Sequence, residues 1–142
     1  MGKQRRDFSQ YEPKILLAFG EAVTGNYKIH KWLLDNGFAE LAALASSLQA
    51  DIPAFEWLLK SGYPQYAAFS NAIDDDKKAL IWLSKHRFFI LAAMVDAAWM
   101  RKNGVEFLKK NKMDIYLRVA MKIRKLKSDQ KRDYDFYYRM HF

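Results

Sequence analysis

One phrase recurs along this chain at a constant interval. Segments that start at His30, Phe55 and Leu80 read HKWLLDNGFAELAAL, FEWLLKSGYPQYAAF and LIWLSKHRFFILAAM, so they lie 25 residues apart. At this interval one column holds Trp32, Trp57, Trp82 and Phe107, and the next holds Leu33, Leu58, Leu83 and Leu108. Periods of about 20 to 50 residues are typical of repeat proteins, whose units cannot bury their apolar faces alone. The repeat therefore predicts stacked copies of one small unit around a shared core.

Each unit contains two helices according to its apolar period. Leu41, Leu44, Ala45 and Leu48 follow the i, i+3, i+4, i+7 spacing of one helical face, and a second stripe starts at Phe55. We expect first helices near 13–25, 38–50, 63–75, 88–100 and 113–126, second helices near 27–36, 52–61, 77–86 and 102–111, and an irregular last helix over 129–140.

The boundaries of these helices carry capping residues. Asn26, Asp51 and Asp76 share one column, where a short acceptor side chain can cap the free amides of the second helix. Gly37 and Gly62 follow the second helix, and glycine at that place can adopt the left-handed conformation that closes the last turn. The signals at both ends therefore agree with the helices read from the period.

The predicted fold class is all-α. The chain is 51% hydrophobic with three prolines and six glycines, which excludes a disordered or collagen-like chain. Short links make consecutive helices antiparallel neighbours, and a series of such hairpins forms an α-solenoid. We expect a right-handed superhelix of about five αα-hairpin units starting near 13, 38, 63, 88 and 113. Residues 1–12 form an N-terminal extension, 13–142 form a single domain, and 127–142 cap it.

The tryptophan column is predicted to lie in the core. A bulky aromatic residue beside leucine at a fixed helical phase is typical of packing between layers. Trp57 is the example in the central unit, and its replacement by alanine would then cost about 3–5 kcal/mol. The alternative is that this column is a stacking platform for a ligand.

The helix pair YPQYAAFSNAIDDDKKALIWLSKHR resembles the helix pair of ankyrin repeats. Pro64 and the pair Ala67-Ala68 lead its first helix, and Trp82 with Leu83 stands in its second. The resemblance extends over nearly the whole chain, in 25-residue units without the β-hairpin finger of ankyrin repeats. It implies a binding scaffold without catalytic residues, and it assigns no site residue.

Positive charge is concentrated in the last third of the chain. The net charge is +8, and residues 99–142 carry thirteen basic and five acidic side chains. Such a cluster can attract phosphates or another anionic surface. The candidate anion- or partner-binding residues are Lys109, Lys110, Arg118, Lys122, Arg124, Lys125 and Lys127.

Three of these cations replace small residues of the repeat. Arg118 shares its column with Ala18, Ala43, Ala68 and Ala93, and Lys122 and Lys125 also fall in columns of mostly small residues. One interpretation is a polar cap on a terminal unit whose outward face meets no further unit. The other is an anion-binding stripe, because a cap could carry either sign and these residues are all positive.

The final stretch, DYDFYYRMHF, departs from the repeat, and Arg132 stands where the tryptophan column would continue. We expect a closing helix that lays Tyr134, Phe136, Tyr137 and Met140 over the open end of the core. The alternative is an exposed aromatic and basic tail that binds a partner or stacks on bases.

Catalytic patterns are sparse. The chain has no cysteine and three histidines, His30, His86 and His141. His30 shares a column with Phe55, Leu80 and Val105, which predicts a partly buried histidine, and no histidine–glutamate spacing suits a zinc helix. The run of aspartates at 74–76 lacks the glycine and later glutamate of a calcium loop, so Asp76 is read as a helix cap. We therefore expect no enzyme activity, no cofactor and no metal.

The sequence also leads to expectations about where the protein is located and what it does. The opening MGKQRRDFSQYEPK lacks the apolar segment of a secretory signal, and no window approaches the roughly 18 apolar residues of a membrane span, so we expect a cytoplasmic protein. The expected function is a helical-repeat scaffold that binds a protein or peptide. The alternative is binding of nucleic acid or another polyanion through the basic C-terminal end.

Overall fold

The computed structural model describes residues 7–141, except for the side chains at 137, 138, 140 and 141. Within these residues it has nine helices and no strand. They are α1 (Pro13–Val23), α2 (Tyr27–Asp35), α3 (Ala39–Leu48), α4 (Ile52–Lys60), α5 (Pro64–Ile73), α6 (Lys77–Lys85), α7 (Phe89–Ala98), α8 (Lys102–Lys110) and α9 (Asp114–His141). The all-α class is confirmed.

The first turn of the second helices confirms the predicted caps. The side chain of Asn26 accepts a hydrogen bond from the amide of Ile29 at 3.2 Å, and Asp51 accepts one from Ala54 at 3.1 Å. Asp76 does the same for the amides of residues 78 and 79 at 3.0 and 3.2 Å. Each bond satisfies an amide that has no partner inside its helix.

The ends of the second helices use a left-handed residue, as predicted for two of them. Gly37 and Gly62 have φ of +88° and +87°. The following amide reaches back to the helix, as from Phe38 to the carbonyl of Leu33 at 2.9 Å. Arg87 and Lys112 take the same place with φ of +62° and +56°, a conformation that costs a residue with a Cβ atom about 1–2 kcal/mol.

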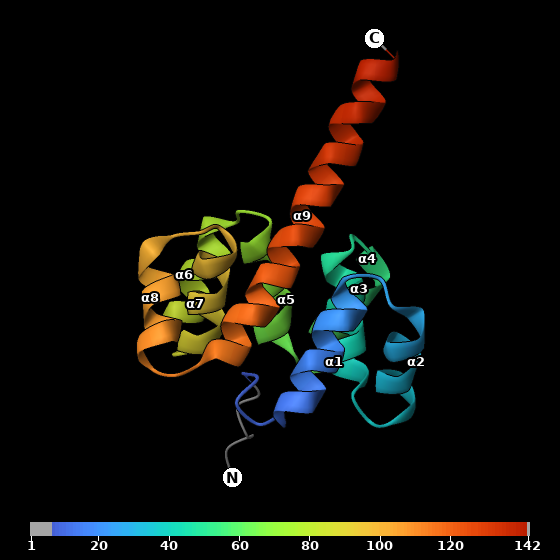
Figure 1. The fold of residues 1–142 in the computed structure, drawn as a ribbon. Coiled ribbons are helices and arrows are strands. Elements are labelled where there is room, and N and C mark those ends of the chain that lie inside the picture. Colours follow the sequence, from blue (N-terminus) through green and yellow to red (C-terminus); the bar gives the residue numbers. More distant parts are fainter. Residues whose placement is uncertain (1–6, 142) are drawn as a thin grey trace.

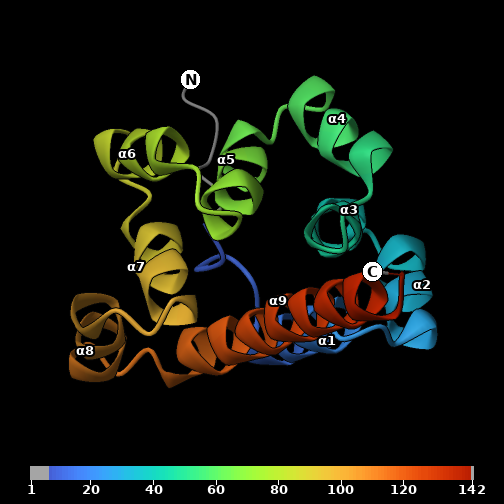
Figure 2. The same ribbon diagram turned by 90° about the horizontal axis from the view of Figure 1, so that it is seen from above.

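The helices form two concentric layers around a common centre. Helices α1, α3, α5, α7 and α9 form the inner layer, and α2, α4, α6 and α8 lie outside them (Figure 1, Figure 2). Helix α9 packs against α7 and also against α1, so the last unit meets the first. Ala42, Ala67 and Ala92, all buried, stand in one column of the inner helices and allow them to approach closely.

The centre of the inner layer is filled from the N-terminal segment. Phe8 is fully buried, and its ring centroid lies 5.4 Å from those of Phe19 and Tyr66. The Tyr66 hydroxyl donates to that of Tyr11 at 3.2 Å, and Tyr11 donates to Glu40 at 2.8 Å. Burial raises the pKa of the Tyr66 phenol above its ordinary value. Part of the expected N-terminal extension therefore belongs to the core.

The prediction that the tryptophan column lies in the core is wrong for Trp32 and Trp57, whereas Trp82 is half-buried against the core. Trp32 and Trp57 are 42% and 40% exposed, whereas the neighbouring leucines are fully buried. The Trp57 ring stacks on Tyr63, with centroids 6.0 Å apart and planes 13° apart, and Trp32 packs in the same way on Phe38. Adjacent helical positions differ by about 100°, so when leucine points to the inner layer the tryptophan lies along the flank.

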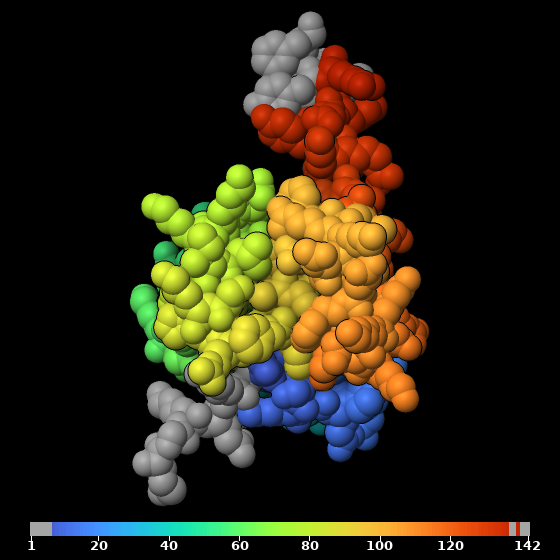
Figure 3. Space-filling view, turned by 90° about the vertical axis from the view of Figure 1, so that its left-hand side faces the viewer, coloured from blue at the N-terminus to red at the C-terminus, as the bar shows by residue number. Residues whose placement is uncertain are grey.

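The prediction of a separate closing helix over 129–140 is also wrong, because α9 is continuous from Asp114 to His141. Its last part stands clear of the body (Figure 3). Tyr134 and Phe136 are 60% and 64% exposed rather than laid over the core. The predicted contacts of Tyr137 and Met140 fall outside the described side chains. No helix within the described residues has the length and apolar character needed to span a bilayer.

Candidate functional site

An apolar groove runs between the outer helices α2 and α4, with α3 as its floor. We call it the outer groove, and its volume is about 260 Å³. Its lining residues are His30, Leu34, Ala39, Ala42, Ala43, Ser46, Ala54 and Trp57. The floor residues from α3 lie at the i, i+3, i+4, i+7 positions of one face and are all small, so the groove is open to the backbone of that helix.

The outer groove contains one histidine, which is half-buried as predicted. The Nε2 atom of His30 lies 3.1 Å from the carbonyl oxygen of Ala42 and 2.9 Å from the hydroxyl of Ser46. A carbonyl only accepts hydrogen bonds, so Nε2 carries the hydrogen in this arrangement. These bonds hold the ring against α3 at the edge of the groove.

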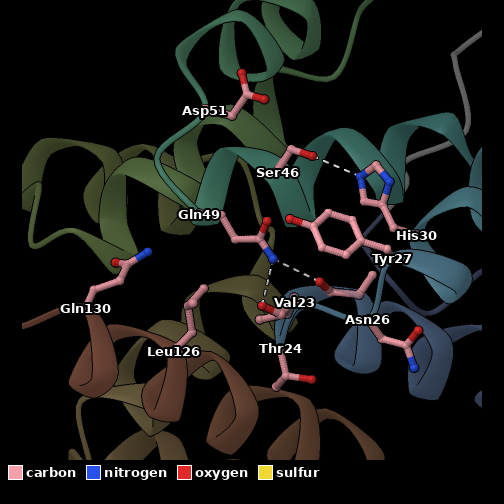
Figure 4. A pocket seen from close by; sticks show the side chains of 12 residues that line it. Val23, Thr24, Asn26, Tyr27, His30, Ser46, Gln49, Asp51, Leu126 and Gln130 are labelled. Carbon is pink, nitrogen blue, oxygen red and sulfur yellow. Dashed lines mark hydrogen bonds between the residues drawn. The ribbon is translucent and has the colours of Figure 1, made fainter. Parts of the chain in front are cut away.

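A more polar pocket adjoins the outer groove at the end of α1. Its volume is about 490 Å³, and its lining combines residues of the first two units with Leu126 and Gln130 of α9 (Figure 4). The side-chain amide of Gln49 donates to the carbonyls of Ala22 and Val23, both at 3.0 Å. His30 and Ser46 line both cavities, so the pocket and the outer groove are neighbours on either side of this hydrogen-bonded pair.

Apolar side chains are exposed on both helices that flank the outer groove, α2 and α4. Leu34 is 49% exposed at the wall, and Leu59 in the same repeat column is 50% exposed. Tyr27 and Ile52, which share another column, are 86% and 68% exposed. Contiguous apolar surface on a monomer is typical of interaction sites, whereas single exposed apolar residues are ordinary. Helices α2 and α4, which form the walls of the outer groove, thus expose several large apolar side chains that the sequence analysis did not predict.

Lys122 lies where the two ends of the array meet. Its ammonium is 2.6 Å from a carboxylate oxygen of Glu21, and its stem crosses Gly20 so closely that an added Cβ atom would lie 2.8 Å from its Cδ. The hydrogen bond and charge of Lys122 lower the pKa of Glu21. The interpretation that this face meets no further unit is wrong at Lys122, because α1 packs against it.

Arg124 and Lys127 bind the ends of inner helices. Arg124 donates to the carbonyl of Ala98 at 2.9 Å, and Lys127 donates to that of Leu48 at 2.7 Å. Lys127 also pairs with Asp74 at 2.9 Å. Carbonyls at a helix C-terminus carry partial negative charge, so these two cations stabilise the contact of α9 with the other inner helices.

A cavity of about 360 Å³ lies beside these two cations. It is also lined by Trp99, Ser128 and Lys131, which the sequence analysis did not single out. The indole of Trp99 already donates to the carbonyl of Ile73 at 3.2 Å. Because its main donors are aimed at carbonyls, the cavity offers an anion little beyond Lys131 and Ser128.

The other four candidate cations are exposed: Lys109 and Lys110 in the last turn of α8, and Arg118 and Lys125 on α9. None of the four forms an ion pair with another described residue. The structure thus divides the predicted set into three cations that bind other groups of the fold, of which Arg124 is also exposed, and four exposed cations without an ion pair to a described residue.

The three aspartates at 74–76 and the histidine His86 all contact other groups of the fold. Asp76 caps α6, Asp74 pairs with Lys127, and Asp75 lies 3.7 Å from Arg101. His86 ends α6, with Nδ1 2.9 Å from the carbonyl of Trp82. No group of three potential metal ligands occurs among the described residues, which exclude the side chain of His141.

Comparison with known proteins gives no match to a family model, to a curated protein or to a solved structure. The resemblance to ankyrin repeats stays a prediction.

Proposed function

We propose that the protein is a non-enzymatic helical-repeat scaffold in the cytoplasm that binds a segment of another protein in the outer groove. Its hairpins would represent one tight turn of a right-handed α-solenoid, with the binding role that the ankyrin resemblance implies. The observation that supports this proposal is the apolar groove between α2 and α4 with its exposed Leu34 and Trp57.

The chemistry of the outer groove favours an amphipathic helix as the bound segment. An extended peptide gains affinity by hydrogen bonding to a free sheet edge, and the described residues contain no strand. The small floor residues Ala39, Ala42, Ala43 and Ser46 allow a helix to approach closely, and Leu34 and Trp57 can pack around apolar anchors at i, i+3 or i+4. The polar pocket beside His30 would receive the polar end of the segment.

Site-specific photo-crosslinking tests this assignment. A photoreactive benzoylphenylalanine replaces Leu34 at the groove wall, and a matched control replaces Ser84, the residue of the same column on α6. After irradiation in native lysate, we expect position 34 to capture one protein whose cross-linked segment is an amphipathic helix. The yield should survive nuclease treatment and change little between about 50 and 200 mM salt, because burial of apolar groups is not screened.

Two outcomes contradict the proposal. Equal capture at positions 34 and 84 would show that the outer groove has no special role. Loss of capture after nuclease treatment would show that nucleic acid mediates it.

Nucleic acid or another polyanion is the second candidate ligand. The observation that favours it is the exposure of Lys109, Lys110, Arg118 and Lys125 without ion pairs to described residues. Binding through phosphates falls steeply as salt rises, so this function requires retention on heparin or DNA at about 50 mM salt and release near 200 mM. No retention at low salt would exclude it.

A further inference from the structure

Four basic residues follow one another at heptad spacing along α9. They are Arg118, Lys125, Arg132 and Arg139. Seven residues make nearly two helical turns, so each side chain leaves the helix only about 20° from the one before it and about 10 Å farther along, and the four lie within about 60° of one another. We call them the α9 row. It extends for about 30 Å, from the first turns of α9 to the part that stands clear of the body (Figure 1).

Helix α9 differs from the other inner helices in having no outer helix after it. Helices α1, α3, α5 and α7 each turn back into an outer helix, whereas α9 continues straight to His141. Arg118 stands in the column of Ala18, Ala43, Ala68 and Ala93, and Ala43 lies between two outer helices in the floor of the outer groove. The fifth unit has therefore replaced a small, mostly half-buried residue with an exposed cation.

The charges of the α9 row are largely available to a partner. All four side chains are exposed, and Arg118, Lys125 and Arg139 form no ion pair with a described residue. Arg132 lies 3.5 Å from Asp129 and 3.9 Å from Asp133 on its own helix, and such exposed pairs are weak. In contrast, Lys122, Arg124 and Lys127 are engaged by the fold.

We propose that the α9 row docks an acidic amphipathic helix of a partner protein, alongside α9. A partner helix has the same rise per residue, so acidic residues at every seventh position would meet all four cations in register. Phe136, 64% exposed and four residues after Arg132, lies on the same face and supplies an apolar contact. This surface is distinct from the outer groove, and the proposal does not require the groove to bind anything.

The apolar residue on this face favours a helix over duplex nucleic acid. Phe136, 64% exposed, can pack on the leucines of an amphipathic helix, whereas a duplex backbone offers it only sugars and phosphates. A protein helix can also place a lysine or arginine opposite Asp129 and Asp133 on this face, whereas a phosphate backbone has no cation to pair with them.

Two synthetic peptides of equal composition test the proposal by fluorescence anisotropy. One is a labelled helix of four heptads with glutamate at every seventh position and leucines beside that stripe. The other has the same residues with the glutamates spread around the helix. We expect the patterned peptide to bind full-length protein about tenfold more tightly than the spread peptide at about 50 mM salt, because only the former can form several pairs at once.

A matched pair of variants locates the binding. Arg118→Gln with Lys125→Gln removes two charges from the row, and Lys109→Gln with Lys110→Gln removes two exposed charges from α8. We expect the row variant to lose about three- to tenfold in affinity and the α8 variant less than about twofold. Circular dichroism melts should match those of the original protein, since none of these side chains pairs with a described residue.

Three results overturn the proposal. They are equal affinity for the two peptides, equal losses in the two variants, or displacement of the patterned peptide by a short single-stranded DNA at equal or lower concentration. The last result would assign the row to nucleic acid. A Leu34→Lys variant should leave the peptide affinity unchanged, so this test and that of the outer groove fail independently.

Discussion

The outer helices α2 and α4 and the outer helices α6 and α8 stand on the same frame but expose different side chains. Their buried column is the same, since Leu33, Leu58, Leu83 and Leu108 are all fully buried. Their exposed columns differ. One exposed column has Tyr27 and Ile52 on α2 and α4 but Lys77 and Lys102 on α6 and α8. Another has Leu34 and Leu59 on α2 and α4 but Ser84 and Lys109 on α6 and α8. Packing on the inner helices requires leucine only in the buried column. The exposed columns are therefore free to differ, and a difference in function can arise there.

We call the units with α2 and α4 the first half and those with α6 and α8 the second half. The two halves also differ in how closely an outer helix packs on its inner helix. In α8, Gly104 approaches α7 so closely that an added Cβ atom would lie 2.6 Å from the carbonyl oxygen of Ala93. Its counterpart in α4 is Ala54, which lines the outer groove instead. Helix α4 thus leaves a groove beside α3, whereas α8 packs closely on α7 and carries lysines in the exposed columns.

The largest expected effect on stability comes from Phe8, which contacts inner helices of both halves. Phe8 contacts Phe19 of α1 and Tyr66 and Phe69 of α5, so Phe8→Ala should leave a cavity in the centre of the inner layer. We expect the free energy of unfolding to fall by about 3–5 kcal/mol, measured by urea denaturation. Tyr27→Ala, at a side chain 86% exposed, is the control and should change it by less than about 0.5 kcal/mol. A loss below about 1 kcal/mol for Phe8→Ala would show that the segment is not part of the core.

The next effect separates the two apolar columns within each half. Leu58→Ala and Leu108→Ala remove fully buried side chains and should each cost about 2–5 kcal/mol, whichever half they occupy. Trp57→Ala should cost only about 1–2 kcal/mol, because the ring is 40% exposed and packs mainly on Tyr63. The measurement is again urea denaturation. A larger loss of unfolding free energy for Trp57→Ala than for Leu58→Ala would show that Trp57, and not only Leu58, is part of the core.

The helices themselves could be predicted because their signals are local. The capping side chain of Asp51 and the left-handed Gly62 lie within a few residues of the helix ends that they define. The long α9 also had a local signal, since neither glycine nor proline occurs between Asp114 and His141. The predicted break near residue 127 came from imposing the repeat on a segment with no residue that ends a helix.

The arrangement of the helices was harder to predict because it depends on contacts between distant residues. Glu21 and Lys122 are far apart in sequence, and only the meeting of α1 and α9 brings them to 2.6 Å. The periodic pattern likewise cannot tell whether Leu58 or its neighbour Trp57 faces the inner layer, because both columns are apolar. The outer groove was missed for the same reason, since its floor consists of ordinary alanines whose exposure is set by the spacing of α2 and α4.

The smallest effect on stability comes from exchanging the exposed columns of the two halves. Leu34→Lys with Leu59→Lys gives α2 and α4 the lysine that α8 carries at Lys109. Because both leucines are about half exposed, we expect the free energy of unfolding to change by less than about 1 kcal/mol in total. Affinity for the helical segment identified by cross-linking should nevertheless fall by more than about tenfold, since an apolar wall is replaced by charge.

The matched control for this exchange is Ser84→Lys, in the same column on α6. It adds a charge to the half that is already cationic, and it should leave both stability and affinity for the segment unchanged, as measured by urea denaturation and fluorescence anisotropy. If Ser84→Lys weakened binding as much as the double substitution, charge repulsion over the whole outer layer would explain the loss. If the double substitution unfolded the protein, the exposed columns would be part of the frame, and the distinction between the two halves would fail.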